Sequence, residues 1–421
     1  MSSIFVQIAS YRDKELLPTL RDIVAKTSSQ NQLTFGIMWQ KDETETIEEF
    51  ANDKRVRIID CDWKQSKGLG WARSLIQTLY QDEDYTIQLD SHHRFAQDWD
   101  VTLINMLDDL KKESNKPLLT SYAYGYDPNN DKILTDIPCR ILFHDFKSSG
   151  TIWLNPTPIP NHKNLNRPIK ARFISGHYFF TNGSHVKEYA YDPDLYFAGD
   201  EITLSTRSYT MGYDLYHPHK NVVWHHYGRT DRAKHWTDHT EKNQSSGLVE
   251  TTWQSRDEYS KQRIRQLLNQ DDYGIDLGQF GLGNSRSLND YEKYAGVDFK
   301  NRRIQNSAIT GIEPPVLFTD EKEWNDGFQK RIPITIKNFQ KEIFLEKIND
   351  ISFFKLEFLS LRRKVIHNQM ITKDYVLNND ALFTTVISDN TPMKFVFAGM
   401  NDNLDVVHVV SSDMRSHVHW N

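Results

Sequence analysis

The first 120 residues alternate short β-forming runs with helix-like segments, and this alternation limits the folds that are open to the chain. The predicted strands are residues 4–9, 33–40, 56–60, 85–89 and 117–122. The predicted helices between them are residues 14–26, 43–52, 70–80 and 98–111. Strands and helices that alternate in this way form a mostly parallel sheet with helices on both faces. We therefore expect an α/β fold in this part of the chain.

Polar side chains follow three of the predicted strands at the point where each strand ends. These side chains are Ser10, Tyr11, Arg12 and Asp13 after the first strand, Gln40 after the second, and Asp90, Ser91 and His92 after the fourth. Ligands of doubly wound sheets bind beyond the carboxyl ends of the strands. The sequence therefore predicts a ligand site at this edge of the sheet.

Asp90 and His92 are candidate ligands for a divalent cation. Side chains two residues apart on an extended chain point to the same side, so this carboxylate and this imidazole are expected to lie together. Carboxylate oxygen suits Mg²⁺ and Mn²⁺, and an imidazole favours Mn²⁺ or another transition metal. The alternative is a strand end with a helix-capping aspartate and solvated histidines, because such short motifs often match by chance.

The segment from Lys67 to Arg73 contains Gly68 and Gly70 and begins a predicted helix. Glycines let a backbone approach a ligand closely, and the N-terminus of a helix favours an anion. Lys67 and Arg73 would add positive charge to a diphosphate site. The alternative is an ordinary turn followed by a solvated arginine.

Two later segments carry further candidate site residues. Asp200 and Glu201 follow a glycine at the start of a predicted helix, where a carboxylate caps the helix or acts as a base or electrostatic stabiliser. Residues 221–224 are a predicted strand that leads into His225, His226 and Arg229. One of these histidines could supply a third metal ligand, and the alternative is a surface histidine pair.

The segment between these candidates has few regular patterns. Residues 123–170 are rich in Pro, Asn and Asp, and only residues 139–143 are a predicted strand within them. A long irregular stretch in an enzyme domain usually shapes a substrate site. Residues 172–181 are a predicted strand that contains His177, which we expect to be a packed or hydrogen-bonded residue.

Composition excludes several classes of function. The net charge is −6, with 51 basic and 57 acidic residues spread along the chain, which argues against general affinity for nucleic acid. Only Cys61 and Cys139 are present, so neither a disulfide framework nor a thiolate zinc site is expected. No apolar stretch approaches the roughly 18 residues of a membrane span, and no signal peptide is predicted. These observations favour a cytoplasmic protein.

The C-terminal part differs in character from the rest. Residues 246–313 are predicted helices and glycine-rich turns that pack on the preceding domain, and Pro314-Pro315 marks a boundary. Residues 314–421 form an all-β domain, predicted as a small antiparallel sandwich. Its predicted strands are residues 332–336, 353–358, 381–386, 393–398 and 404–410. We therefore expect three parts, 1–245, 246–313 and 314–421.

Five blocks in residues 1–245 carry a family resemblance. The block from Gln88 to Phe95 resembles the Gln-(Ile/Leu)-Asp-Ser-His-x-Arg-Phe block of the GlcNAc-transferase family that includes the enzyme modifying hydroxyproline on Skp1-type proteins. The other blocks that resemble this family, in the same order, are residues 8–13, 70–73, 199–207 and 225–229. The more distant polypeptide GalNAc-transferases are similar in using an Asp-x-His and a later His on the metal.

The resemblance implies a GT-A fold with one Rossmann-like sheet, and retaining transfer of GlcNAc or a related sugar from a UDP-sugar with a divalent cation. The residues it implicates are Asp90, His92 and His225 on the metal, with His226 as the fallback; Ser10, Tyr11 and Arg12 at uridine; Arg73 at ribose or diphosphate; and Asp200 and Glu201 at the sugar or acceptor. Asp200 replaces a family glutamate, which shortens its reach. Lys67 or Arg229 would assist departure of the diphosphate.

The acceptor implied is a hydroxyl on a protein or a glycan. The alternative function is a catalytically silent module of the same fold that binds a sugar nucleotide or a glycan. Association into a homo-oligomer is left open by the sequence.

Overall fold

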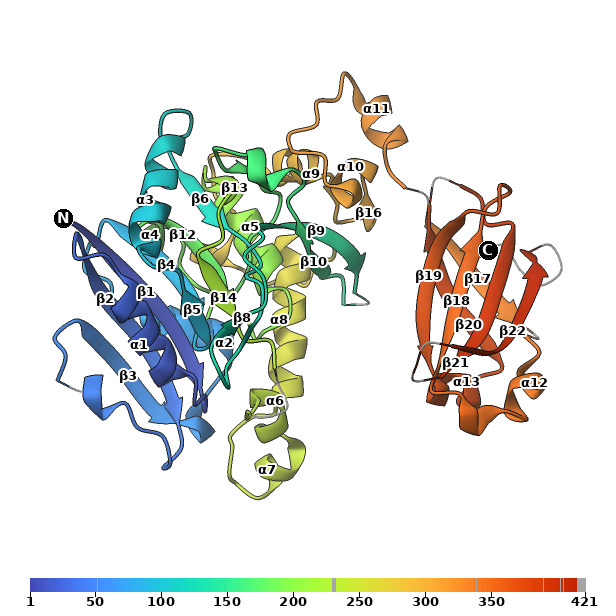
Figure 1. The fold of residues 1–421 in the computed structure, drawn as a ribbon, viewed down its shortest axis with the longest axis horizontal. Helices are drawn as coiled ribbons and strands as arrows, with labels where there is room; N and C mark the ends of the chain where they lie inside the picture. The colour runs from blue at the N-terminus through green and yellow to red at the C-terminus, as the bar shows by residue number, and fades with distance from the viewer. Residues whose placement is uncertain are drawn as a thin grey trace. The chain divides into compact units, whose positions relative to one another are not determined.

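The computed structural model describes residues 1–50, 52–147, 149–228, 232–329, 331–337, 339–388, 390–401, 403 and 405–414 (Figure 1). The chain forms two compact units. The larger unit comprises Met1–Arg302 and Ser307–Phe318, and the smaller comprises Arg303–Asn306 and Thr319–Asn421. Residues 246–302, predicted to pack on the preceding domain, belong to the same unit as residues 1–245.

An eight-stranded sheet of order β11-β13-β6-β12-β4-β1-β2-β3 forms the centre of the larger unit. Its strands are β1 (Ser2–Tyr11), β2 (Asn31–Lys41), β3 (Val56–Asp62), β4 (Tyr85–Asp90), β6 (Pro117–Thr120), β11 (Ile169–Lys170), β12 (Tyr178–Asn182) and β13 (Asp214–His217). The strands β4, β1, β2 and β3 are mutually parallel, whereas β12 is antiparallel to both of its neighbours. The predicted α/β fold is confirmed.

Helices cover both faces of this sheet, as predicted. The helices of the larger unit are α1 (Leu16–Lys26), α2 (Leu69–Gln77), α3 (Trp99–Leu110), α4 (His185–Glu188), α5 (Asp200–Thr210), α6 (His235–Asp238), α7 (Glu241–Ser245), α8 (Trp253–Leu267) and α9 (Leu288–Ala295). Side chains of β1 alternate between two cores. Val6 and Ile8 pack with apolar residues of α1 and α3, and Phe5 packs with residues of α2.

Two predictions of local structure are wrong. Residues 43–52 are not an α-helix, because only Glu48–Phe50 form a single 3₁₀ turn. Asp42 accepts a hydrogen bond from the Thr44 N–H and donates its own N–H to the Glu45 carboxylate, so local side chains replace helical bonds. In residues 172–181 only β12 is a strand, because the Ile174 N–H donates to the Ser205 hydroxyl rather than to a neighbouring strand.

Two small antiparallel pairs beside the main sheet also matter for the site. The first joins β9 (Cys139–Phe146) to β10 (Ile152–Pro158). The sequence predicted a strand within β9 but none at β10, because two prolines interrupt the pattern of β10. The second joins β5 (His93–Phe95) to β14 (Val223–His225). The remaining short elements are β7 (Tyr126–Asp127), β8 (Lys132–Ile133), β15 (Val297–Asp298), β16 (Arg303–Ile304) and α10 (Asn306–Thr310).

The smaller unit is a β-sandwich, as predicted. A pair formed by β17 (Arg331–Lys337) and β20 (Ala381–Ile387) faces an antiparallel sheet of β19 (Val365–Thr372), β18 (Phe353–Leu359), β21 (Lys394–Met400) and β22 (Val406–Asp413). One core joins them, with Ile336 from the pair and Phe354 and Phe397 from the sheet. Helices α11 (Glu321–Asp326), α12 (Lys341–Leu345) and α13 (Lys373–Asn378) complete this unit. Leu404, the first residue of the last predicted strand, lies outside the described residues.

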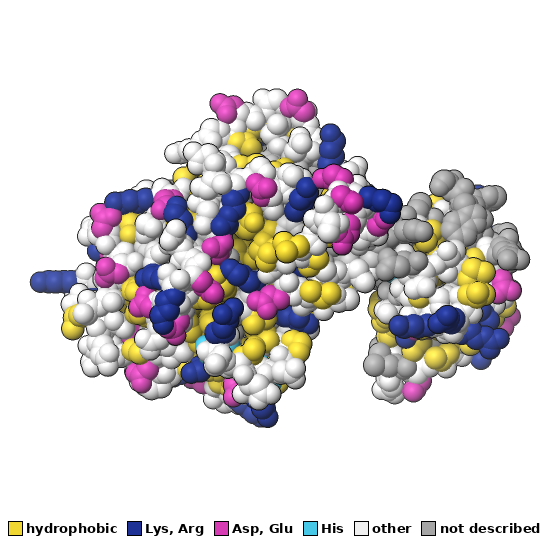
Figure 2. All heavy atoms as spheres, turned by 90° about the horizontal axis from the view of Figure 1, so that it is seen from above, with side chains coloured by type: hydrophobic (Ala, Val, Ile, Leu, Met, Phe, Trp, Pro, Cys, Tyr) yellow, Lys and Arg dark blue, Asp and Glu magenta, His cyan; other side chains and the backbone are white. Residues whose placement is uncertain are grey.

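Charges of both signs are interspersed on the face shown in Figure 2, without a continuous basic patch among the side chains drawn there. Among the described residues, every helix is too short or too polar to cross a lipid bilayer.

Candidate functional site

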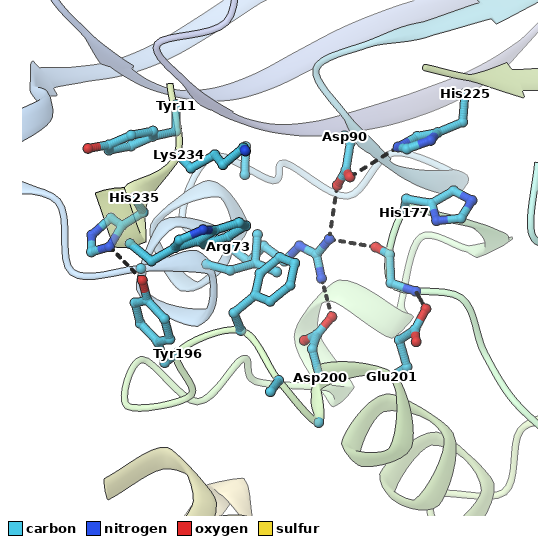
Figure 3. Close-up of a pocket in the computed structure, with 18 of the residues that line it drawn as sticks. Tyr11, Arg73, Asp90, His177, Tyr196, Asp200, Glu201, His225, Lys234 and His235 are labelled. Atoms are coloured by element: carbon cyan, nitrogen blue, oxygen red, sulfur yellow. Dashed lines mark hydrogen bonds and ion pairs between the residues drawn. The ribbon is translucent and has the colours of Figure 1, made fainter. Parts of the chain in front are cut away.

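A cavity of about 660 Å³ opens at the carboxyl edge of the parallel strands. Tyr11 at the end of β1, Gln40 in β2 and Asp90 at the end of β4 line it. Asp200 and Glu201, the first two residues of α5, line it from the opposite side (Figure 3). The cavity is therefore where the strand-end rule placed a ligand site.

Asp90, His92 and His225 form a cluster whose ligand atoms all lie within 4.8 Å of one another. Asp90 Oδ2 lies 3.4 Å from His225 Nε2 and 3.8 Å from His92 Nε2. The pairing of β5 with β14 creates this cluster, because it sets His225 opposite His93, the residue after His92. His226 is outside the cluster, and its ring lies against Tyr126.

Asp13 orients His92. Asp13 Oδ2 accepts hydrogen bonds from His92 Nδ1 and from Ser91 Oγ, each 2.7 Å long. Burial opposes ionisation of Asp13, but His92, Ser91 and Arg232 outweigh it and lower the pKa of this carboxyl below its ordinary value. His92 Nδ1 also contacts the Arg232 guanidinium. In the tautomer that donates its Nδ1 proton to Asp13, His92 directs a bare Nε2 toward Asp90, and this buried atom has no hydrogen-bond partner among the described residues.

The other carboxylate oxygen of Asp13, Oδ1, accepts a hydrogen bond from the N–H of Glu15, which occupies the N-cap position of α1. The sequence offered one signal for its real role, since Asp13 belongs to the polar cluster at the end of β1. That signal could not show which partner its carboxylate would meet.

The protonation states of the cluster suit a cation. Burial would raise the pKa of Asp90, but the histidines His225 and His92 and then Arg73 hold it well below its ordinary range. Burial and then the neighbouring His177 lower the pKa of His225 well below its ordinary value. His177 itself accepts a hydrogen bond at Nε2 from the Ala123 N–H, which agrees with the expectation of a packed, hydrogen-bonded residue.

Arg73 lies buried between two carboxylates. Its guanidinium donates to Asp200 Oδ2, to the Gly176 carbonyl and to the Tyr191 hydroxyl, and one nitrogen lies 3.5 Å from Asp90 Oδ1 (Figure 3). The sequence placed Arg73 at a ribose or a diphosphate. In the structure it lines the cavity, but protein groups take most of its donors.

Glu201 has a different environment from its neighbour Asp200. It accepts hydrogen bonds from the Tyr122 hydroxyl and from the Gly176 N–H, and no cation pairs with it among the described residues. Burial is the main reason that its pKa rises to about 7. Its carboxyl group therefore titrates near neutrality, whereas the Asp200 carboxylate is paired with Arg73.

The glycines before α2 serve packing rather than an anion. The Leu69 and Gly70 N–H groups donate to the carbonyls of Tyr196 and Leu195, so they are not open to a ligand. A Cβ on residue 70 would lie 2.4 Å from the Leu195 oxygen, which explains the need for glycine there. Lys67 is exposed and does not line the cavity.

Of the remaining predicted residues, two line the cavity, two do not, and one is not described. Gln40 and Ser91 line the cavity, but the Gln40 amide bonds Ser66 and the Ser10 carbonyl. Ser10 and Arg12 do not line it: the Ser10 side chain is fully buried, and Arg12 forms ion pairs with Asp42 and Asp238. Arg229 lies outside the described residues.

The structure adds residues that the sequence reasoning missed. Arg232, Lys234 and His235 line the cavity from the segment that leads into α6, and Figure 3 shows Lys234 on the same side as Asp90. Lys234 makes no hydrogen bond or ion pair through its side chain with any described residue. A run containing two cations after a histidine motif was the only sequence signal.

Aromatic side chains form the rim of the cavity. Trp153 of β10 and Phe197 are 53% and 45% exposed, and both line the cavity. Trp236 lies against Phe197, with ring centroids 5.5 Å apart. These rings give the cavity lining an apolar surface that is partly open to solvent.

Two solved structures and one family model are similar to parts of this chain. The structure of GalNAc-T7 with UDP, GalNAc and Mn²⁺ aligns with a TM-score of 0.48 and 16% identity, over 65% of this chain and 53% of that chain. The S. aureus TarS 1-349 structure in complex with UDP-GlcNAc aligns with a TM-score of 0.37 and 9% identity, over 65% and 77%. No curated protein matches the chain in sequence. The model of the family described as "Glycosyltransferase (GlcNAc)" matches residues 3–54 and 44–301, and the chain therefore belongs to this glycosyltransferase family.

Proposed function

We propose that this chain transfers GlcNAc, or a related hexose or N-acetylhexosamine, from a UDP-sugar to a hydroxyl group on a protein or glycan. The observation that carries the proposal is the cluster of Asp90, His92 and His225 at the cavity of a GlcNAc glycosyltransferase family member. This proposal requires a divalent cation, Mn²⁺ or Mg²⁺, as cofactor and a UDP-sugar donor as co-substrate.

The cluster residues fit a divalent cation. One carboxylate and two imidazoles supply three ligand atoms, and the buried Nε2 atoms of His92 and His225 both lack a hydrogen-bond partner among the described residues. Asp90 keeps 30% of its side chain exposed toward the cavity, so substrate oxygens can complete the coordination. Imidazole nitrogens favour Mn²⁺ over Mg²⁺. When bound, such a cation acts as a Lewis acid that neutralises charge on the leaving diphosphate.

Different residues of the cavity then contact different parts of the UDP-sugar donor. Lys234, whose ammonium group has no partner among the described residues, contacts a phosphate oxygen. Arg232 also lines the cavity, with its guanidinium paired to Asp13. Tyr11 provides the aromatic wall for uracil, because its ring lies 5.2 Å from that of His235 at the far end of the cavity from Glu201 (Figure 3). Arg73 holds the Asp90 and Asp200 carboxylates in place.

Glu201 is the group that we place next to the transferred sugar and the acceptor hydroxyl. Its pKa near 7 lets it accept a proton and return it, or stabilise positive charge on the sugar when ionised. The rim formed by Trp153, Phe197 and Trp236 receives the acceptor, because sugar rings and apolar side chains both pack on aromatic faces. Retention of configuration and a cytoplasmic location are further parts of the proposal, the latter because both cysteines are free.

The test is release of UDP from UDP-GlcNAc by the full chain with Mn²⁺ and with EDTA. We expect turnover that depends on Mn²⁺, and we expect Asp90→Ala to abolish it while circular dichroism and cooperative unfolding are unchanged. Asp108→Ala on α3, an aspartate 49% exposed, is the matched control. Tight binding of UDP without turnover would instead support a silent sugar-nucleotide-binding module. Full activity of Asp90→Ala would refute the metal site.

A further inference from the structure

A second cavity, of about 260 Å³, lies in the larger unit and shares no lining residue with the first. Two arginine side chains line it, namely Arg140 of β9 and Arg172. Lys170 of β11 borders it too, but its ammonium group donates to the hydroxyl of Tyr216, which does not line the cavity. The chain segment 311–314 forms part of its wall. Nothing in the proposed transfer reaction uses these residues.

Arg172 is 4% exposed, yet it has no carboxylate partner among the described residues. Its Nε donates to the Ala295 carbonyl and its Nη1 to the Ile312 carbonyl, whereas its buried Nη2 has no hydrogen-bond partner. A buried charge without a counter-ion is expensive, because the charge has lost its hydration. Burial accordingly lowers the pKa of Arg172 to about 10, which still leaves it protonated at neutral pH.

Arg140 has the same incomplete set of partners. Its guanidinium donates to the Gly311 carbonyl, and its Nε is buried without a partner. Carbonyl oxygens satisfy some donors of both arginines, but they carry no formal charge. Two guanidinium groups therefore line one cavity, and each has a buried N–H donor without a partner among the described residues.

The other lining groups do not balance this charge. Glu313 is the single carboxylate among the described lining residues, and it accepts a hydrogen bond from the Lys170 backbone N–H. His217 is neutral, because burial lowers its pKa to about 4. Two guanidinium groups thus face one carboxylate, which leaves about one positive charge uncompensated.

We propose that this second cavity binds a phosphate-type oxyanion, held by Arg140 and Arg172. A phosphate group would supply the missing negative charge, and the planar forks of two arginines match its oxygens. The cavity is larger than one phosphate group, and its remaining wall is apolar, with Ile141, Ile159 and Ile312. A phosphomonoester with a compact organic body and free phosphate are the two sources of this group.

Thermal unfolding of the full chain in EDTA tests the proposal, with inorganic phosphate as the probe and sodium chloride matching the ionic strength. We expect a saturable rise in Tm of roughly 2 to 4 °C at about ten times the dissociation constant. Arg140→Gln and Arg172→Gln should each remove the saturable rise. Lys112→Gln, which removes one exposed charge just after α3, is the matched control and should keep it.

Two further comparisons distinguish phosphate binding in this cavity from other effects of phosphate on stability. Lys234→Ala in the first cavity should keep the response, because that lysine does not line the second cavity. Phosphate also stabilises proteins by exclusion from their surface, but that effect rises linearly and would be equal in all variants. A methyl phosphate series identifies the source: saturation at lower concentration than inorganic phosphate points to a phosphomonoester, and the reverse order to free phosphate.

Three results would overturn the proposal. They are a response to acetate as large as the response to phosphate, a rise that does not saturate, and a saturable rise retained in both Arg140→Gln and Arg172→Gln. If a glutamine variant does not fold, Arg140→Lys replaces it. That variant keeps the charge but loses the planar fork, and we expect it to raise the half-saturating phosphate concentration about 10-fold or more.

Discussion

Replacing Glu201 by glutamine tests how burial controls the site. Its pKa rises from 4.5 to about 7 because the folded protein removes water from the carboxyl group. A carboxyl group with a raised pKa favours the folded state while it is protonated. That stabilisation is complete below the ordinary pKa and is lost as the pH rises through about 7.

The size of the effect follows from the shift. With these two pKa values, the wild-type chain should lose roughly 2 kcal/mol of unfolding free energy between about pH 5.5 and about pH 8.5 through this group alone. Glutamine is neutral at every pH, so Glu201→Gln avoids this loss. The amide fits the site, since its oxygen can accept from the Gly176 N–H while the Tyr122 hydroxyl rotates to accept from its NH₂ group.

The assay is urea unfolding of the full chain at both pH values, followed by tryptophan fluorescence. We expect the difference in stability between Glu201→Gln and wild type to grow by roughly 2 kcal/mol in favour of the variant at the higher pH. Glu43→Gln, at an exposed glutamate, is the control for loss of a carboxylate. The reasoning is wrong if the difference between Glu201→Gln and wild type is the same at both pH values.

Activity supplies an independent reading of the same group. If the Glu201 carboxylate is the active form, log(kcat/KM) rises with pH and levels off near pH 7. Tyr122→Phe removes a hydrogen bond that lowers the pKa of Glu201, so the profile should move to higher pH. Glu201→Gln should lower kcat by roughly 10²- to 10⁴-fold. A profile that does not move in Tyr122→Phe contradicts the assignment.

Three shorter predictions concern other parts of the larger unit. Asp13→Asn should weaken Mn²⁺ binding about 10- to 100-fold in a calorimetric titration, because the Asp13 carboxylate orients His92. Lys234→Ala should raise the KM for UDP-GlcNAc about 10-fold or more, whereas the exposed Lys220→Ala should not change it. Gly70→Ala should destabilise the chain by about 2 kcal/mol or more in urea unfolding, since its Cβ would lie 2.4 Å from a backbone oxygen; unchanged stability would refute that packing argument.

The sequence by itself determined the α/β frame and two of the three residues of the candidate metal site. Alternating apolar runs specify strands and helices locally, and parallel strands bring their carboxyl ends to one edge. Asp90 and His92 lie on one short segment, so their proximity follows from two-residue spacing. The apolar pattern failed to predict the structure of residues 43–52, because side chains of Asp42 and Glu45 compete there with the hydrogen bonds of a helix.

Tertiary structure decided everything that depends on distant pairing or on burial. The spacing of the sequence left His225 and His226 equivalent, and only the antiparallel register of β5 and β14 brought His225 to Asp90. The raised pKa of Glu201 and the uncompensated charge of Arg172 arise because packing removes water from these groups. No local pattern records that removal, because it depends on which segments, far apart in the chain, close over each side chain.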